Sequence, residues 1–143
     1  MPKLAMNYNN AVIYKIVCND LTITDSYVGS TTNFIKRKYQ HNDACKTKNL
    51  KIYQFIREHG GWNNWSMVLV EEFPTTSRLL LGQRERYWFE ILGSTLNYNI
   101  PARSDKEYRD DNKDKIVEYQ KLYRDQNRIN YALKMSLLNH ISP

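Results

Sequence analysis

The chain has 143 residues, enough for one hydrophobic core with an appendage and too few for two ordinary domains. Its 21 Lys and Arg residues outnumber its 15 Asp and Glu residues, which gives a formal net charge of +6 at pH 7. Together with 13% aromatic residues, this basic charge favours a nucleic-acid partner.

The two cysteines, Cys18 and Cys45, lie far apart and form neither a CxxC pair nor a cluster with histidines. This pattern excludes a disulfide framework and a structural zinc site, and it indicates a reducing compartment. No apolar run reaches membrane-spanning length, and the N-terminus lacks a signal-peptide pattern. We therefore expect a soluble, intracellular protein with no membrane partner.

Residues 11–18 alternate in polarity and predict a strand, and residues 25–30 predict a second strand after a polar connection. Two such strands in sequence form an antiparallel hairpin. If the hairpin is symmetric about Asp20 and Leu21, Tyr14 and Tyr27 face each other with Cβ atoms about 5 Å apart. Such a tyrosine pair is also common as plain sheet packing.

Residues 27–41 join a strand, a tight turn and the start of a basic helix. Gly29 predicts a backbone turn that is closed to bulkier residues, and the run from Ser30 to Asn33 supplies helix-capping side chains. Arg37 and His41 stand one helical turn apart on the same face. The alternative is an ordinary strand-to-helix turn with a solvated basic face.

Basic residues follow closely between positions 36 and 51, where Asp43 is the single acidic residue. They predict a positive patch that contacts DNA phosphates, formed by Lys36, Lys38, Lys46, Lys48 and Lys51.

A second helix is expected from about Leu50, with Ile52, Phe55 and Ile56 inward, and it ends at Gly60 and Gly61. Residues 66–73 predict a third strand that is largely buried on both faces. Residues 78–92 predict a strong helix that Gly93 stops.

Glu85 lies in the middle of an apolar stripe on that helix, between Leu81 and Trp88. A buried carboxylate without a partner is costly, and the positions one turn away offer no cation. Glu85 therefore needs a partner from elsewhere, either an arginine or a bound metal ion.

After Pro101 the composition changes, and Ser104 with Glu107 forms a capping box that starts a new helix. The segment Tyr108-Arg109-Asp110-Asp111-Asn112 returns fifteen residues later as Tyr123-Arg124-Asp125-Gln126-Asn127. The apolar stripe is thin and surrounded by charges of both signs. We expect residues 104–143 to form a solvent-exposed helical tail that is ordered with a partner.

The ordered set of motifs from Ala11 to Ile100 resembles the GIY-YIG nuclease superfamily. Val12-Ile13-Tyr14 is similar to the first signature, with Val12 in place of the usual first glycine, and Tyr27-Val28-Gly29 is similar to the second. The thirteen residues between the tyrosines exceed the usual spacing, so a longer hairpin turn is expected. The tail resembles those of members from large DNA viruses or mobile elements.

Other motifs supply the remaining site residues by the same resemblance. Arg37 stands where the family places its arginine, and His41 matches a histidine of some branches. Glu85, within Arg84-Glu85-Arg86-Tyr87-Trp88, matches the metal-binding glutamate, and Asn99 matches the terminal Tyr-Asn motif.

The resemblance implies an α+β domain over residues 11–101, with a small three-stranded antiparallel sheet flanked by helices and a C-terminal helical extension. It implies a DNA endonuclease in which Glu85 holds one Mg²⁺ (or Mn²⁺) ion and Arg37 stabilises the pentacovalent phosphate. Tyr14 activates the attacking water, with Tyr27 as the alternative, and His41 and Asn99 orient phosphate and backbone.

Two readings of the function stay open at this point. The first is the endonuclease, of a homing, viral or mobile-element kind, acting in the cytoplasm or nucleus of a host cell. The second is a catalytically inactive DNA-binding module of the same fold, which binds DNA without metal-dependent cleavage. The oligomeric state does not follow from the sequence.

Overall fold

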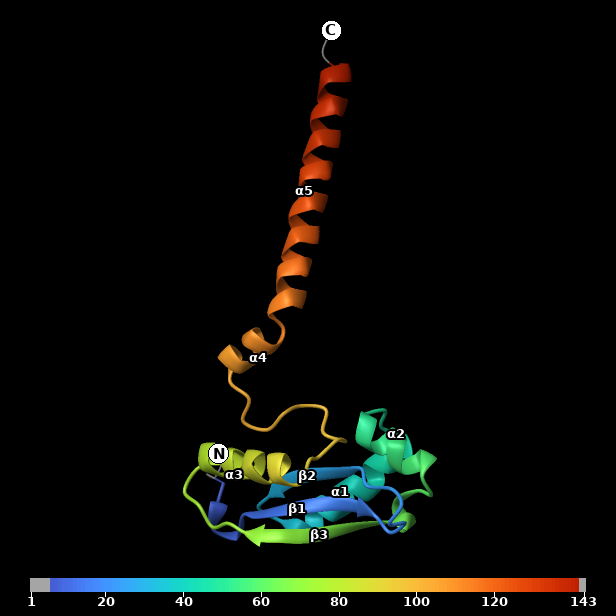
Figure 1. Cartoon of the computed structure of the whole chain (residues 1–143), viewed down its shortest axis with the longest axis vertical. Coiled ribbons are helices and arrows are strands. Elements are labelled where there is room, and N and C mark those ends of the chain that lie inside the picture. Colours follow the sequence, from blue (N-terminus) through green and yellow to red (C-terminus); the bar gives the residue numbers. More distant parts are fainter. Residues whose placement is uncertain (1–5, 142–143) are drawn as a thin grey trace, which may run out of the picture. The chain divides into compact units, whose positions relative to one another are not determined.

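The structure is a computed structural model that describes residues 6–141. Its centre is a three-stranded antiparallel sheet in which β1 (Val12–Cys18) lies between β2 (Ser26–Thr31) and β3 (Trp65–Glu72), as Figure 1 shows. Helices accompany this sheet, so the predicted α+β fold with a three-stranded antiparallel sheet is confirmed.

The helices follow the predicted order. They are the short 3-10 turns η1 (Tyr8–Asn10) and η2 (Trp62–Asn64) and the α-helices α1 (Phe34–Thr47), α2 (Lys51–Glu58), α3 (Arg78–Ile91), α4 (Asp105–Asp111) and α5 (Lys113–Ile141). Asn33 caps α1, Ser77 caps α3 and Ser104 caps α4, in each case by accepting a hydrogen bond from the third residue of the helix. The polar residues that precede the apolar runs therefore fix where these helices begin.

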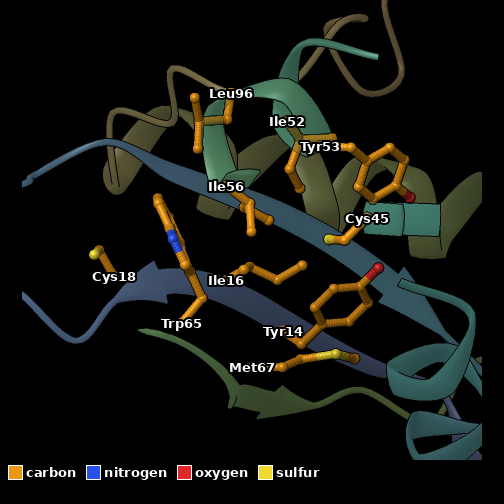
Figure 2. Packing of buried hydrophobic residues seen from close by; sticks show 10 residues of the cluster. All are labelled: Tyr14, Ile16, Cys18, Cys45, Ile52, Tyr53, Ile56, Trp65, Met67 and Leu96. Carbon is orange, nitrogen blue, oxygen red and sulfur yellow. The ribbon is translucent and has the colours of Figure 1, made fainter. Parts of the chain in front are cut away.

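Two buried clusters cover the two faces of the sheet because side chains alternate along β1. On one face Tyr14, Ile16 and Cys18 pack against α1 and α2, and Figure 2 shows this cluster. Its buried members are Tyr14, Ile16, Cys18, Cys45, Ile52, Tyr53, Ile56, Trp65, Met67 and Leu96. On the other face Ile13 and Val28 pack against Leu81 of α3. Both faces of β1 are thus packed against helices.

The predicted pairing of the two tyrosines is wrong. Tyr14 lies opposite Gly29, and Tyr27 lies opposite Ile16, so the tyrosines are diagonal neighbours on one face. Their ring centroids are 6.2 Å apart. The register differs because Asp20 folds the turn onto Thr22, with Asp20 Oδ1 accepting from Thr22 N at 3.0 Å, which moves the hairpin centre toward β2.

Gly29 is required for a reason other than the predicted turn. It lies inside β2, and no positive φ is found there. A Cβ atom at position 29 would lie 2.5 Å from both Cζ and Oη of Tyr14. The Tyr14 ring therefore occupies the space that a side chain at position 29 would fill.

The prediction that the third strand is buried on both faces is also wrong. Trp65 and Met67 are buried, but Val68 and Leu69 are 38% and 46% exposed. β3 is an edge strand, so part of its apolar surface meets solvent.

Polar contacts fix α3 on the sheet. Arg84 donates two hydrogen bonds to Glu71 of β3, at 2.7 and 2.6 Å, and Trp88 Nε1 donates to the same carboxylate at 3.2 Å. Leu81 and Trp88 face the second cluster, as the apolar stripe predicts. Glu85 lies between them on the helix, so the clamp between Arg84 and Glu71 also sets the position of Glu85.

The contacts divide the chain into two units, residues 1–102 and residues 103–143. The second unit contains α4 and α5, and most apolar side chains of α5 are exposed, including Leu122 and Leu133 at 62% and 60%. The last two residues of the predicted tail, 142 and 143, lie outside the described residues. Within residues 6–141, none of the helices has the length and apolar character needed to cross a membrane.

Candidate active site

A cleft of about 840 Å³ is lined by four of the side chains that the motifs single out. Tyr14 comes from β1, Tyr27 and Ser30 from β2, Arg37 from the second turn of α1, and Glu85 from the middle of α3. Three consecutive elements and the more distant α3 therefore bring two phenols, a guanidinium and a carboxylate to one surface.

The Tyr14 hydroxyl is held inside a hydrogen-bonded network. Arg37 Nε donates to Tyr14 Oη at 3.3 Å, and Tyr14 Oη lies 2.7 Å from Nε2 of His41. The Tyr27 ring lies beside the Tyr14 ring, with centroids 6.2 Å apart, and the two phenols interact electrostatically. Both tyrosines line the cleft, and Tyr27 is the more exposed of the two because Tyr14 is fully buried.

His41 lies behind the tyrosines, 1% exposed, with its second ring nitrogen, Nδ1, 3.0 Å from Tyr53 Oη. Burial, and then the positive charge of Arg37, lower the pKa of His41 to about 3. The imidazole is therefore neutral at physiological pH and carries one ring N–H.

Glu85 is partly buried and lines the cleft. Burial raises the pKa of its carboxyl to about 7, although hydrogen bonds to Ser30 and the positive charge of Arg37 act in the opposite direction. No ion pair within 4.0 Å involves Glu85 among the described residues. The arginine that partly compensates its charge is Arg37, which acts at longer range.

The chain also matches known proteins over this region. The model of the GIY-YIG catalytic domain matches residues 10–99, which is well over half of the chain. The chain belongs to the GIY-YIG family. It is therefore an enzyme of the nuclease class, and the resemblance seen in the motifs is confirmed.

Solved structures agree with the family match. The chain is similar to the catalytic domain of the homing endonuclease I-TevI, with 30% identity, a TM-score of 0.52, and coverage of 63% of this chain and 97% of that chain. A second structure is a glutamate-to-alanine mutant of the same domain of intron endonuclease I-TevI, with 28% identity, a TM-score of 0.52, and coverage of 66% and 96%. No curated protein gives a significant match.

Asn99 of this GIY-YIG domain lies at a second hollow, of about 380 Å³, and does not line the main cleft. Tyr27, Arg37 and Glu85 line both cavities, and Tyr53 lines the second. Asn99 is exposed. The role predicted for Asn99, orienting phosphate and backbone, is therefore a role at the rim of the second hollow and not in the main cleft.

The five lysines of the predicted patch are all exposed, but they lie in two groups. Lys36 and Lys38 flank Arg37 on α1, and Lys46, Lys48 and Lys51 lie around its far end. Ten residues of helix separate Lys36 from Lys46, which is about 15 Å. Lys46 lies 3.7 Å from Asp43, and Lys51 Nζ donates to the Thr95 carbonyl at 2.8 Å. None of the five lines the main cleft.

Two residues of the site carry no motif signal in the sequence. Asn97 binds the edge of β2 by accepting from Val28 N at 3.1 Å and donating to Val28 O at 2.8 Å. Tyr53, 6% exposed, contacts His41 from α2. The sequence does indicate that Tyr53 is buried, because Tyr53 follows Ile52 and lies one turn before Ile56 on the apolar side of a short helix.

Proposed function

We propose that this GIY-YIG protein is a metal-dependent DNA endonuclease that hydrolyses phosphodiester bonds. The observation that carries the proposal is the convergence of two tyrosines, an arginine and a carboxylate on one cleft, with Arg37 hydrogen-bonded to Tyr14. The four residues are Tyr14, Tyr27, Arg37 and Glu85. Each is a residue type that phosphoryl hydrolysis needs, and a domain kept only for binding would not need the set.

Arg37 fits the role of stabilising the phosphate. Its guanidinium is permanently charged and lies next to both tyrosines, and its Nε points at Tyr14. A phosphate bound in the cleft gains charge on its equatorial oxygens as the attacking oxygen approaches, and a fixed cation lowers the energy of that state.

Tyr27 and Tyr14 act together on the attacking water. Tyr27 faces the cleft and takes a proton from the water, and Tyr14 lies behind it as the next hydrogen-bonding group. An unassisted phenol near pKa 10 is a poor base at neutral pH, so the proton must be passed on. The sequence favoured Tyr14 and kept Tyr27 as the alternative, and the burial of Tyr14 favours a shared role.

The chemistry of Glu85 fits a divalent metal ion. Among the described residues there is no group of three or more His, Cys, Asp and Glu side chains able to hold a metal, so a site made wholly of protein ligands does not fit. Mg²⁺ accepts one carboxylate and keeps several waters, and a cation beside Glu85 offsets the cost of its burial. When bound, Mg²⁺ or Mn²⁺ would supply charge stabilisation for the leaving oxygen.

The remaining candidate residues have supporting roles. His41 holds the hydroxyl of Tyr14, and Asn99 contacts the DNA backbone at the second hollow. The exposed lysines Lys36 and Lys38 bind phosphates beside Arg37. Since the solved relative is a homing endonuclease, we propose the same kind of mobile-element role for this chain, in the cytoplasm or nucleus of its host.

The test is Glu85→Gln, which keeps the shape of the side chain and removes its charge. Supercoiled plasmid, branched DNA and randomised duplexes are incubated with each protein and Mg²⁺, with EDTA as the blank. We expect cleavage to fall by at least about two orders of magnitude, because charge stabilisation of a leaving oxygen contributes several kcal/mol. DNA affinity is expected to persist or increase as the repulsion from phosphate falls.

Cleavage near the wild-type rate by Glu85→Gln would contradict the metal assignment. If the wild-type protein binds DNA and cleaves none of these substrates with Mg²⁺ or Mn²⁺, the inactive DNA-binding module is the correct function. A large fall in melting temperature with activity retained would identify Glu85 as a structural ion-pair residue.

A further inference from the structure

Three buried side chains form a continuous hydrogen-bonded chain behind the cleft. Tyr14 Oη lies 2.7 Å from His41 Nε2, and His41 Nδ1 lies 3.0 Å from Tyr53 Oη. The three residues are 0%, 1% and 6% exposed. In Figure 2 the hydroxyl oxygens of Tyr14 and Tyr53 both lie toward α1, the helix that carries His41.

The contacts give this chain a direction. A neutral imidazole has one N–H donor and one acceptor nitrogen. When Nδ1 carries the proton, it donates to Tyr53, and Nε2 accepts from the Tyr14 hydroxyl. Arg37 Nε donates to the same Tyr14 oxygen and so fills one of its acceptor positions. If each link passes one proton along while another proton enters at Tyr14 and one leaves from Tyr53, His41 ends in the opposite tautomer and every group stays neutral.

Charged intermediates are costly at these positions. Burial raises the pKa of Tyr14 above its ordinary value, and Tyr27 adds to this rise while Arg37 opposes it. Burial and Arg37 keep His41 from becoming an imidazolium. A stepwise transfer would form a Tyr14 phenolate or a His41 cation, whereas a concerted shift forms neither.

The chain ends at a residue that the main cleft does not reach. Tyr14 lines the main cleft alone, Tyr27 lines the cleft and the second hollow, and Tyr53 lines the second hollow beside the exposed residues Leu50 and Asn99. Tyr53 is therefore the last residue of the hydrogen-bonded chain, and the second hollow lies beside it.

We propose that Tyr14, His41 and Tyr53 form a proton relay that carries the proton of the attacking water from the cleft to the second hollow. The relay rests on the proposed hydrolytic function. The water O–H bond breaks as its oxygen bonds to phosphorus, Tyr27 takes the proton, and Tyr27 passes its own to Tyr14. Tyr14 gives its proton to His41 Nε2, His41 Nδ1 gives its proton to Tyr53, and Tyr53 releases its own to water.

The first test is Tyr53→Phe, which keeps the ring in the core and breaks the last link. Single-turnover cleavage of plasmid with saturating Mg²⁺ is expected to slow by roughly a hundredfold, at the lower end of the range for positioned proton transfer. DNA affinity is expected to change less than about twofold. Tyr39→Phe is the matched control, because Tyr39 is 69% exposed on α1 and makes none of these contacts.

The second test reads proton movement directly. In mixtures of H₂O and D₂O, the wild-type cleavage rate is expected to depend on the deuterium fraction along a curve, as several protons move together. For Tyr53→Phe the plot is expected to be linear. A role of Tyr53 in packing alone would lower stability and leave the shape of this plot unchanged.

The third test needs no activity. Nitrogen-15 NMR of the wild-type protein is expected to show a neutral His41 with its proton on Nδ1, and Tyr53→Phe is expected to shift the tautomer toward Nε2–H. A linear wild-type plot, a wild-type Nε2–H tautomer, or a wild-type cleavage rate for a folded Tyr53→Phe would each overturn the relay. Failure of the wild-type protein to cleave DNA would instead overturn the proposed function.

Discussion

Gly29 shows how a backbone position controls the chemistry of the site. Its missing side chain leaves room for the Tyr14 ring. The hydroxyl of that ring hydrogen-bonds to both Arg37 Nε and His41 Nε2. The glycine of the second motif is therefore a steric requirement of the tyrosine of the first.

Gly29→Ala tests this dependence. The added Cβ would overlap Cζ and Oη of Tyr14 at 2.5 Å, so the ring must move away from Arg37 and His41. We expect a loss of stability of about 1–3 kcal/mol, as for other overpacked cores, and at least a tenfold fall in cleavage. Gly82→Ala is the control for stability, because its added Cβ would meet only an ordinary contact at 3.9 Å. Unchanged cleavage by a folded Gly29→Ala would contradict the requirement.

Glu85 also predicts a pH dependence of stability. Its pKa is raised from 4.5 to about 7 in the folded protein, so the folded state binds more protons than the unfolded state between these values. The free energy of unfolding therefore falls as the pH rises through this window. We expect the contribution of Glu85 to decrease by roughly 1–3 kcal/mol between pH 5 and pH 7.5 in EDTA.

Chemical denaturation of wild type and Glu85→Gln across this range measures the difference. His41 acts in the opposite sense, because its lowered pKa removes stability as the pH falls below 6.5, but this contribution is common to both proteins and cancels. Saturating Mg²⁺ is expected to reduce the difference at high pH by favouring ionised Glu85. Parallel stability curves for the two proteins would show that Glu85 is solvated.

At the scale of elements, periodicity and capping residues predict nearly every helix and strand. The apolar stripe around Leu81 and Trp88 and the stop at Gly93 placed α3 correctly. The predicted register of β1 and β2 is wrong because the register depends on the turn around Asp20. The polarity pattern does not encode the hydrogen bonds of that turn. The prediction that β3 is buried on both faces is wrong because the sequence does not reveal which strand lies at the edge of the sheet.

The sequence predicted the site residues that belong to motifs and missed those that do not. Tyr27, Arg37 and Glu85 converge on the cleft as the resemblance implied, although their catalytic roles stay predictions. Tyr53 was missed because its part depends on how α2 packs against His41, a contact between residues twelve apart in sequence. Asn97 was missed because a loop that pairs with an edge strand has no periodic signal.

The geometry of α1 separates the lysines into groups that DNA binding can distinguish. Lys36→Ala with Lys38→Ala is expected to reduce the log–log salt slope for duplex DNA by up to about 1.8, since each phosphate contact contributes roughly 0.9. Lys46→Ala with Lys51→Ala is expected to reduce it less, because Lys46 pairs with Asp43 and Lys51 binds the Thr95 carbonyl. If neither double variant changes the slope, both groups are solvated surface.

At the scale of the whole molecule, both core clusters are made by residues that precede the C-terminal unit. A chain of residues 1–103 is therefore expected to melt cooperatively and to cleave DNA. We expect its affinity for DNA to be weaker, because α4 and α5 carry exposed tyrosines and many charges. Thermal denaturation and a binding titration check this. Loss of cooperative melting would show that residues 104–143 belong to the core.

The length of α5 sets a scale for that tail. Its 29 residues contain neither glycine nor proline, so the uninterrupted helix is about 43 Å long. Duplex DNA rises about 3.4 Å per base pair, which makes the helix equal to roughly 13 base pairs. A tail that follows the duplex would thus lengthen the stretch protected from chemical footprinting by about one turn of the double helix, while the cut itself stays where residues 1–103 place it.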